Sequence, residues 1–119
     1  MDWNLDNGRP IWPQLAQQLA RRIIAGVYPP GSRLPSVREM AAEAGVNPNT
    51  MQRALAQLEQ EGLARADRTA GRLVTRDVQI LDAARLREAQ AVIQGYFEAM
   101  SALGYSREQA AELIKEEFL

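Results

Sequence analysis

A tight turn at Gly45 separates two short amphipathic patterns, and no other feature of the sequence restricts the fold as strongly. Before the turn, Ser36 and Glu39 match the S-x-x-E capping box and start a helix that Gly45 ends. After the turn, Asn47 is a suitable N-cap and Pro48 a suitable first helical residue. Two short helices joined in this way predict a helix-turn-helix. Their apolar residues recur at i, i+3, i+4 and i+7, as Val37, Met40, Ala41 and Ala44 and then as Met51, Ala54, Leu55 and Leu58.

The segments on either side of this pair extend the pattern. Residues 1–9 are expected to form an irregular arm, and a helix follows that starts at Pro10 or Pro13. After the pair, the segments 63–67 and 72–76 are expected to form a small hairpin, although the first is rich in alanine and weak as a strand. The sequence therefore predicts a mainly α fold with a small β-hairpin.

The rest of the chain is expected to be helical. One long helix should run from about Val78 to Leu103, and Gly104 should end it. A second capping box, from Ser106 to Gln109, opens a last helix. The apolar residues of that helix that are expected to face inward are Ala110, Leu113, Ile114 and Phe118.

The long helix carries a heptad seam that looks too wide for the last helix to cover. We therefore expect it to pair with a second copy of the chain, so that residues 77–119 form a two-helix dimerisation region behind a winged helix-turn-helix domain at residues 1–76. The alternative is that the long helix folds back on its own winged domain. The expected dimerisation residues are Leu86, Ala89, Ile93, Tyr96, Phe97, Met100 and Leu103.

Composition excludes several classes of function. The chain has neither cysteine nor histidine, so disulfides, zinc fingers, thiol nucleophiles and histidine-based acid–base catalysis are excluded. Neighbouring carboxylates such as Glu59 and Glu61 diverge on a helix, so we expect no catalytic residues, no metal and no cofactor. No apolar run approaches the roughly 20 residues that span a bilayer, and the N-terminal segment is polar and acidic. We expect a cytoplasmic protein without a membrane partner.

Charge is divided unevenly along the chain. Residues 1–76 carry a net charge of +3 and residues 77–119 a net charge of −4. This division favours a polyanion as the partner of the first segment only. Chance scatter of surface charge is the alternative interpretation.

The second helix of the pair presents a polar outer face. With its apolar residues turned to the core, Asn49, Gln52 and Arg53 face away, and Thr50 lies near the boundary. Asn and Gln can pair with adenine and Arg with guanine, each contributing about 1–3 kcal/mol of discrimination. The first turn carries no carboxylate, and its N–H groups and dipole favour an anion. The alternative is the solvated face of an ordinary helical hairpin.

Arginines flank this polar face on both sides. Arg38, near the start of the first helix of the pair, is placed to reach a phosphate or a base. In the hairpin, Arg68 and Arg72 suit a wing that touches the minor groove or phosphates. These residues together favour DNA binding. A winged domain used for protein–protein contact is the alternative.

Two motifs carry a family resemblance. They are G-x-x-P-P-G-x-x-L-P-S-x-R-x-x-A from Gly26 and G-V-x-x-x-T from Gly45, and with them residues 10–74 closely resemble the winged helix-turn-helix domain of GntR-family transcription regulators. That family's wing usually carries Gly-x-Gly where this chain has Thr69-Ala70-Gly71, so the approach of the wing tip to DNA is left open. The resemblance implies a double-stranded DNA operator, contacted by the wing tip and by Arg38, Asn47, Asn49, Thr50 and Gln52.

The length of the segment after Arg76 indicates which subfamily of GntR regulators the chain resembles. The segment after Arg76 is too short to enclose a drug-sized pocket in a monomer, unlike the large ligand-binding domains of many GntR regulators. A two-helix tail is similar to that of the YtrA-like subfamily, whose members resemble small dimeric repressors, often of transporter operons. A homodimer of identical readers predicts a pseudo-palindromic operator. A small-molecule effector near Tyr96, Phe97 and Tyr105 is left open beside a packing role for these aromatic residues.

Overall fold

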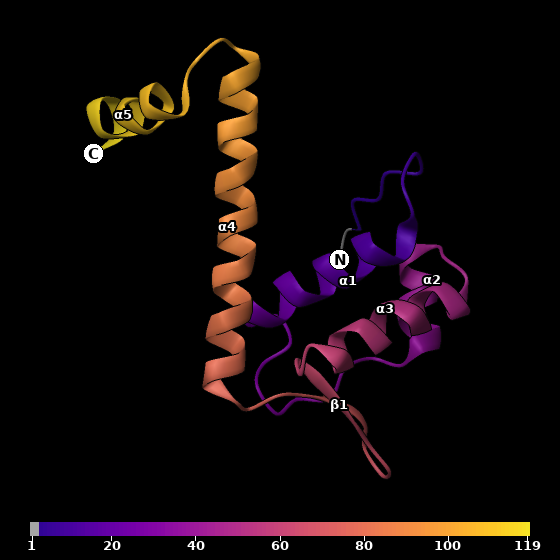
Figure 1. Ribbon diagram of the computed structural model, residues 1–119. Helices are drawn as coiled ribbons and strands as arrows, with labels where there is room; N and C mark the ends of the chain where they lie inside the picture. Colours follow the sequence, from indigo (N-terminus) through magenta and orange to yellow (C-terminus); the bar gives the residue numbers. More distant parts are fainter. Residues whose placement is uncertain (1–2) are drawn as a thin grey trace. The chain divides into compact units, whose positions relative to one another are not determined.

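The computed structural model describes residues 3–119 and confirms a mainly helical fold with one small antiparallel hairpin. No helix in this part of the chain is long and apolar enough to cross a membrane. The elements, drawn in Figure 1, are α1 (Ile11–Ile24), α2 (Val37–Ala44), α3 (Pro48–Gln60), β1 (Ala64–Asp67), β2 (Gly71–Val74), α4 (Val78–Ala102) and α5 (Arg107–Phe118).

The chain packs as two compact units, one ending at Arg85 and the other running from Leu86 to Leu119. The first unit includes the first turns of α4, because Leu81 and Ala84 are buried in its hydrophobic core. In addition, Arg85 donates a hydrogen bond of 2.9 Å from Nη2 to the backbone oxygen of Ile24. By packing, the first unit therefore continues past the 76/77 domain boundary that the sequence indicates.

The core of the first unit is built from the apolar stripes that the sequence predicts. Helix α3 packs on both α1 and α2, and its residues Met51, Leu55 and Leu58 are fully buried. From α1, Leu15 and Leu19 are also fully buried. Complete burial of such side chains contributes about 1.5–3 kcal/mol each. This core fixes which face of α3 is left outside.

Caps set the ends of the short helices. The Ser36 hydroxyl accepts a hydrogen bond of 3.1 Å from the Glu39 N–H at the start of α2. Gly45 ends α2 with φ of 70°, a left-handed conformation that glycine adopts at little cost. Asn47 caps α3 through a hydrogen bond of 2.7 Å from the Asn49 N–H to Asn47 Oδ1. The predicted helix starts at Ser36 and Asn47 are therefore confirmed.

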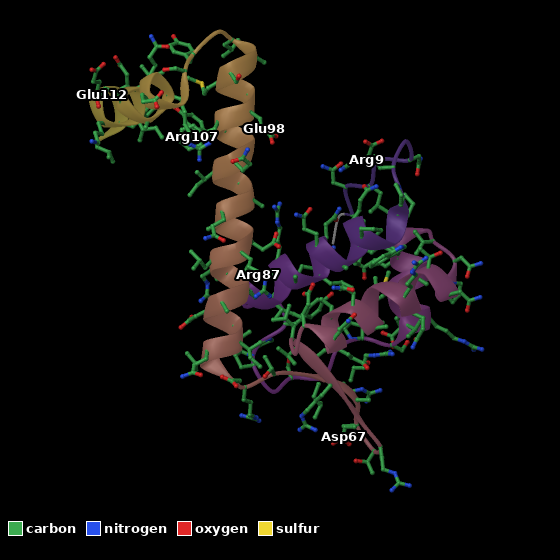
Figure 2. All side chains as sticks on the ribbon, viewed as in Figure 1. Arg9, Asp67, Arg87, Glu98, Arg107 and Glu112 are labelled. Atoms are coloured by element: carbon green, nitrogen blue, oxygen red, sulfur yellow. The ribbon has the colours of Figure 1, made fainter. Side chains whose placement is uncertain are left out.

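The hairpin is shorter than the sequence indicates, because its second strand begins at Gly71 and ends at Val74. Strands β1 and β2 pair from Ala64 opposite Val74 to Asp67 opposite Gly71. The chain before α2 adds to this sheet, since the Leu34 N–H donates to the Arg72 oxygen at 2.9 Å. The hairpin extends beyond α1, α2 and α3, with Asp67 near its far end (Figures 1 and 2). We call this hairpin the wing.

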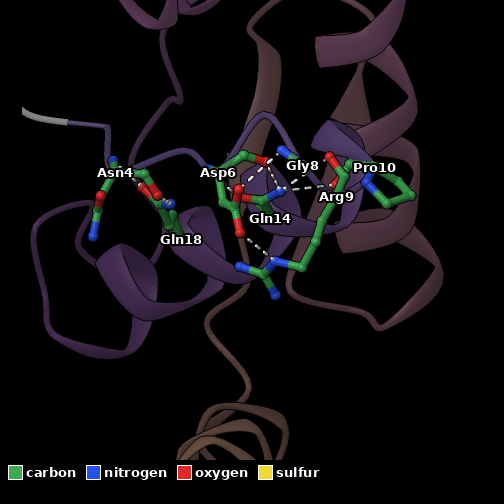
Figure 3. A network of polar contacts seen from close by, with 7 residues as sticks. All are labelled: Asn4, Asp6, Gly8, Arg9, Pro10, Gln14 and Gln18. Carbon is green, nitrogen blue, oxygen red and sulfur yellow. Dashed lines mark hydrogen bonds and ion pairs between the residues drawn. The ribbon is translucent and has the colours of Figure 1, made fainter.

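Residues 3–10 contain no helix or strand, as expected for an arm, yet they are fixed by glutamine side chains of α1 (Figure 3). Gln18 pairs with the backbone of Asn4 in both directions, at 3.2 and 2.6 Å. Gln14, which is buried, pairs in the same way with the backbone of Asp6, at 2.7 and 2.8 Å. Each side-chain amide thereby makes the two hydrogen bonds that a neighbouring β-strand would make with the backbone of that residue. The arm is an ordered part of the first unit.

In the second unit, α5 packs on α4 through few contacts. The Tyr96 hydroxyl donates to the backbone oxygen of Ala110 at 2.6 Å, and Ala110 is buried. The Arg107 guanidinium stands 4.2 Å from the centre of the Phe97 ring (Arg107 is labelled in Figure 2). Of the four residues expected to face inward, Ala110 is buried and Leu113 half-buried. The expectation is wrong for Ile114 and Phe118, which are 36 and 80% exposed. A short helix offers one narrow packing stripe, and α4 occupies it.

Candidate nucleic-acid interface

The outer face of α3 is polar and accessible. Because Met51, Ala54, Leu55 and Leu58 are all fully buried, the opposite side of the helix is turned away from the core. We call its residues the reading face. Among the residues that the structure describes, the Asn49 and Gln52 side chains have no hydrogen-bond partner, so their amide groups are available to base edges. The reading face comprises Asn49, Gln52, Arg53, Ala56 and Gln60, all of them exposed.

The N-terminus of α3 offers fewer donors than the sequence suggests. Pro48 has no N–H, and the Asn49 N–H is bound to Asn47 Oδ1. The N–H groups of Thr50 and Met51 donate to the backbone oxygen of Asn47, at 3.0 and 3.1 Å. The three N–H groups are thus already engaged within the helix and its cap, and attraction of an anion to this N-terminus stays a prediction. An approaching phosphate meets the helix dipole and the Asn47 amide N–H₂.

Thr50 lies at the edge of the reading face, half-buried, as the sequence indicates. It lines a cleft of about 470 Å³ between the arm and the helix-turn-helix, together with Trp3, Leu5 and Asn47. The cleft places Thr50 and Asn47 on the side of α3 that faces the arm. Contacts of these two residues with DNA stay a prediction.

Arg53 is exposed, and its guanidinium carbon stands 4.6 Å from the centre of the Trp12 ring. Trp12 lies in the first turn of α1, which packs along α3. Sequence reasoning missed Trp12, because only the packing of α1 on α3 brings it to Arg53. The contact draws Arg53 toward the α1 side of the reading face.

Arg38 is exposed near the N-terminus of α2 and has no hydrogen bond or ion pair within residues 3–119. A groove of about 370 Å³ lies between the start of α2 and the wing. Arg33 and Arg72 are among its lining residues, and so is Asp67. Arg33 is a further cationic candidate that no local sequence pattern indicates. Its position follows from an isolated antiparallel β-bridge between Arg33 and Leu73 of β2.

The wing tip is organised by Asp67. One oxygen of its carboxylate, Oδ1, accepts hydrogen bonds from the Ala70 N–H, the Thr69 N–H and the Thr69 hydroxyl, each at 2.9 Å. The Ala70 N–H, and after it the two Thr69 donors, hold the pKa of Asp67 below its ordinary value. Thr69 therefore has its donors engaged and offers DNA only a hydroxyl oxygen. Arg68, exposed beside it, is the donor that the tip presents.

Arg72 has an internal partner. Its Nε–H donates to a carboxylate oxygen of Glu59 on α3, and its side chain is only 20% exposed. The structure thus separates the predicted arginines into two groups. Arg38, Arg53 and Arg68 are exposed with their hydrogen-bond donors unused inside the described chain, whereas Arg72 links the wing to α3.

The residues expected at a dimer interface are exposed to different degrees. Leu86, Ile93 and Leu103 are 59, 53 and 73% exposed, and Ala89 is exposed as well. Tyr96, Phe97 and Met100 are half-buried. For Tyr96 and Phe97, the contacts with α5 provide the packing role considered from the sequence.

Phe97 also lines a shallow groove of about 300 Å³ with Tyr105 and Arg107. An effector at this place stays a prediction.

Comparisons with known proteins agree with this architecture. Residues 13–74 match the model of a family described as bacterial regulatory proteins of the gntR family. The HTH-type transcriptional regulator YhcF of Bacillus subtilis is 35% identical over 97% of this chain and 95% of its own length. The HTH-type transcriptional repressor YtrA of the same organism is 37% identical, over 59% of this chain and 54% of its own length. A solved GntR-family regulator from Listeria monocytogenes superposes with a TM-score of 0.81 at 31% identity, covering 94% of this chain and 98% of its own.

Proposed function

Because the chain belongs to the gntR family of bacterial regulatory proteins and is a DNA-binding transcription regulator, not an enzyme, we propose that it works as a homodimeric repressor. In this proposal two copies bind a pseudo-palindromic operator, each placing α3 in a major groove. The setting is the cytoplasm, where the operator lies. The name of the similar repressor YtrA supports repression in particular.

The observation that carries the proposal is the reading face of α3. Its exposed amides and guanidinium lie on a helix that is anchored by a fully buried apolar stripe. A rigidly held helix with unpaired donors and acceptors suits recognition of base edges, because no internal partner competes for those groups. Arg38 on α2 and Arg68 at the wing tip lie on neighbouring elements and supply cations for the phosphates beside the groove. Electrostatic attraction and base readout therefore have separate residues.

The second half of the proposal, a homodimer, rests on the apolar surface of α4. On this helix of 25 residues, Leu86, Val92 and Ile93 are all more than half exposed, and so is Leu103, which directly follows the helix. Phe118 of α5 is exposed as well. The apolar residues that recur every three or four positions match the seam of a helix pair, and a twofold interface would bury the same seam of both copies. They are Leu86, Ala89, Ile93, Tyr96, Met100 and Leu103.

Selection of DNA fragments by the purified full chain, followed by sequencing, tests the proposal. The expected result is a short motif with inverted symmetry, whose half-sites lie about one helical turn apart or a multiple of it. Binding should weaken steeply between two salt concentrations, because cations of the protein release counterions from DNA. Recovery of no enriched motif, together with salt-independent retention, would indicate a module for protein–protein contact instead.

Repression is tested separately. A reporter gene placed behind the selected motif should fall in expression when the chain is supplied in cells. A rise in expression would leave DNA binding intact and identify an activator.

A further inference from the structure

The contact between Trp12 and Arg53 joins the start of α1 to the reading face. Pro10 is the N-cap of α1 and Trp12 is the second residue of the helix. The Trp12 side chain therefore projects from the first turn. Trp12 is half-buried and Arg53 exposed, with 4.6 Å between the guanidinium carbon and the ring centre. At this distance the cation lies within the range in which the face of an indole ring attracts it. A residue outside the helix-turn-helix therefore contacts a side chain on the reading face.

The geometry leaves the hydrogen bonds of Arg53 unused. The cation–π contact with the Trp12 ring is not a hydrogen bond, so it leaves the five N–H donors of the guanidinium unused. Within residues 3–119, Arg53 makes no hydrogen bond or ion pair, unlike Arg72, whose Nε–H is bound to Glu59. Trp12 can thus restrict the rotamers of Arg53 without occupying the atoms that would bind guanine.

We infer that Trp12 is a positioning residue that holds Arg53 in place for base reading at the α1 side of the reading face of α3. An arginine that is ordered before binding loses less conformational entropy when it meets its base. Trp12 then contributes to specificity at one position of the operator without touching the base there. The inference rests on the proposed function of the reading face.

The first test examines the contact without DNA. In the NMR spectrum of the free chain, the ring current of Trp12 should displace the Arg53 Nε–H resonance. The displacement should disappear in Trp12→Ala and persist in Trp12→Phe, whose smaller ring still offers a face. An Arg53 resonance that is identical in wild type and Trp12→Ala would overturn the inference, even if DNA binding is normal.

The second test is a double-mutant cycle on the selected operator. Arg53→Ala should lower affinity and abolish discrimination at one base pair, and Trp12→Ala should weaken discrimination at that same pair by about two- to fivefold. In the Arg53→Ala background, Trp12→Ala should have no further effect, and Trp12→Phe alone should retain most of the discrimination. The unfolding temperature of each variant controls for folding, and Trp12→Leu replaces the alanine variant if that one fails to fold.

The outcomes separate the inference from the proposed function. If Trp12→Ala weakens binding to all fragments equally, or by the same factor with and without Arg53, its role is structural and the inference is wrong. The same holds if Arg53→Ala changes no base preference. If the wild-type chain selects no motif at all, the proposed function fails and this inference fails with it.

Discussion

Arg72 of β2 and Glu59 of α3 form an ion pair that joins the wing to α3. The two side chains are 20 and 33% exposed, so water screens the pair less than it screens a pair on the open surface. The pair also determines what the Arg72 side chain binds, since its Nε–H is directed at Glu59 rather than toward a nucleic acid. It holds the wing to the helix that carries the reading face.

Glu59→Gln should lower the free energy of unfolding by about 1–3 kcal/mol, because it leaves the partly buried Arg72 cation without its counter-charge. Denaturant unfolding of the full chain measures the loss. Asp82→Asn is the matched control, since Asp82 forms an exposed pair with Arg85. That change should cost less than about 1 kcal/mol. Equal losses in the two variants would show that the Arg72–Glu59 pair contributes no more than a surface contact.

Arg38→Ala should weaken binding to every DNA fragment by a similar factor, because a phosphate contact carries no sequence information. The slope of log affinity against log salt concentration should fall by about one for each protomer. Arg87→Ala, which removes an arginine that is also exposed but lies on α4, should leave both quantities unchanged. A change of base preference in Arg38→Ala would instead assign this residue to base reading.

Ile93→Glu should convert the dimer to a monomer and abolish operator binding in parallel, since it places a charge in the apolar seam. Ala91→Glu introduces the same charge at an exposed position on the opposite side of α4 and should affect neither property. Analytical ultracentrifugation at micromolar concentration should show wild type at twice the protomer mass of 13.2 kDa. A wild-type monomer that still binds the complete operator would contradict the dimer.

Tyr96 is a poorer target for the same experiment. Its hydroxyl binds the backbone of Ala110, so a change there disturbs the packing of α5 as well as the seam.

Asp67 should titrate below its ordinary pKa of 3.8, because the Ala70 N–H and the two Thr69 donors stabilise its carboxylate. A pKa that is lowered by folding contributes stability above 3.8, and that contribution is lost as pH falls through the folded value. Thr69→Val removes the hydroxyl donor alone and should raise the pKa of Asp67 part of the way. NMR titration of the carboxyl carbon measures both values. Thr75→Val, a matched change outside the tip, should leave the pKa of Asp67 unaltered.

Local sequence signals predicted most of the first unit. The caps at Ser36 and Asn47 and the stop at Gly45 place the two short helices within the bounds that the structure shows, because capping and left-handed turns depend on adjacent residues. The hairpin was located, but its second strand was misplaced, since β-pairing depends on cross-strand and same-face neighbours. Phe118 was wrongly expected inside, because an apolar period shows a face without showing what covers it.

The sequence by itself determined the helix-turn-helix and the polar face of α3, since periodicity and capping act over a few residues. Tertiary structure alone decided how the arginines on and around that face are used. Arg72 binds Glu59, and Arg53 lies over the Trp12 ring, through contacts between different helices and strands of the fold. The physical reason is that a guanidinium sits at the end of a long, flexible side chain. Its partner is therefore chosen by whatever the fold brings within reach, which no local pattern records.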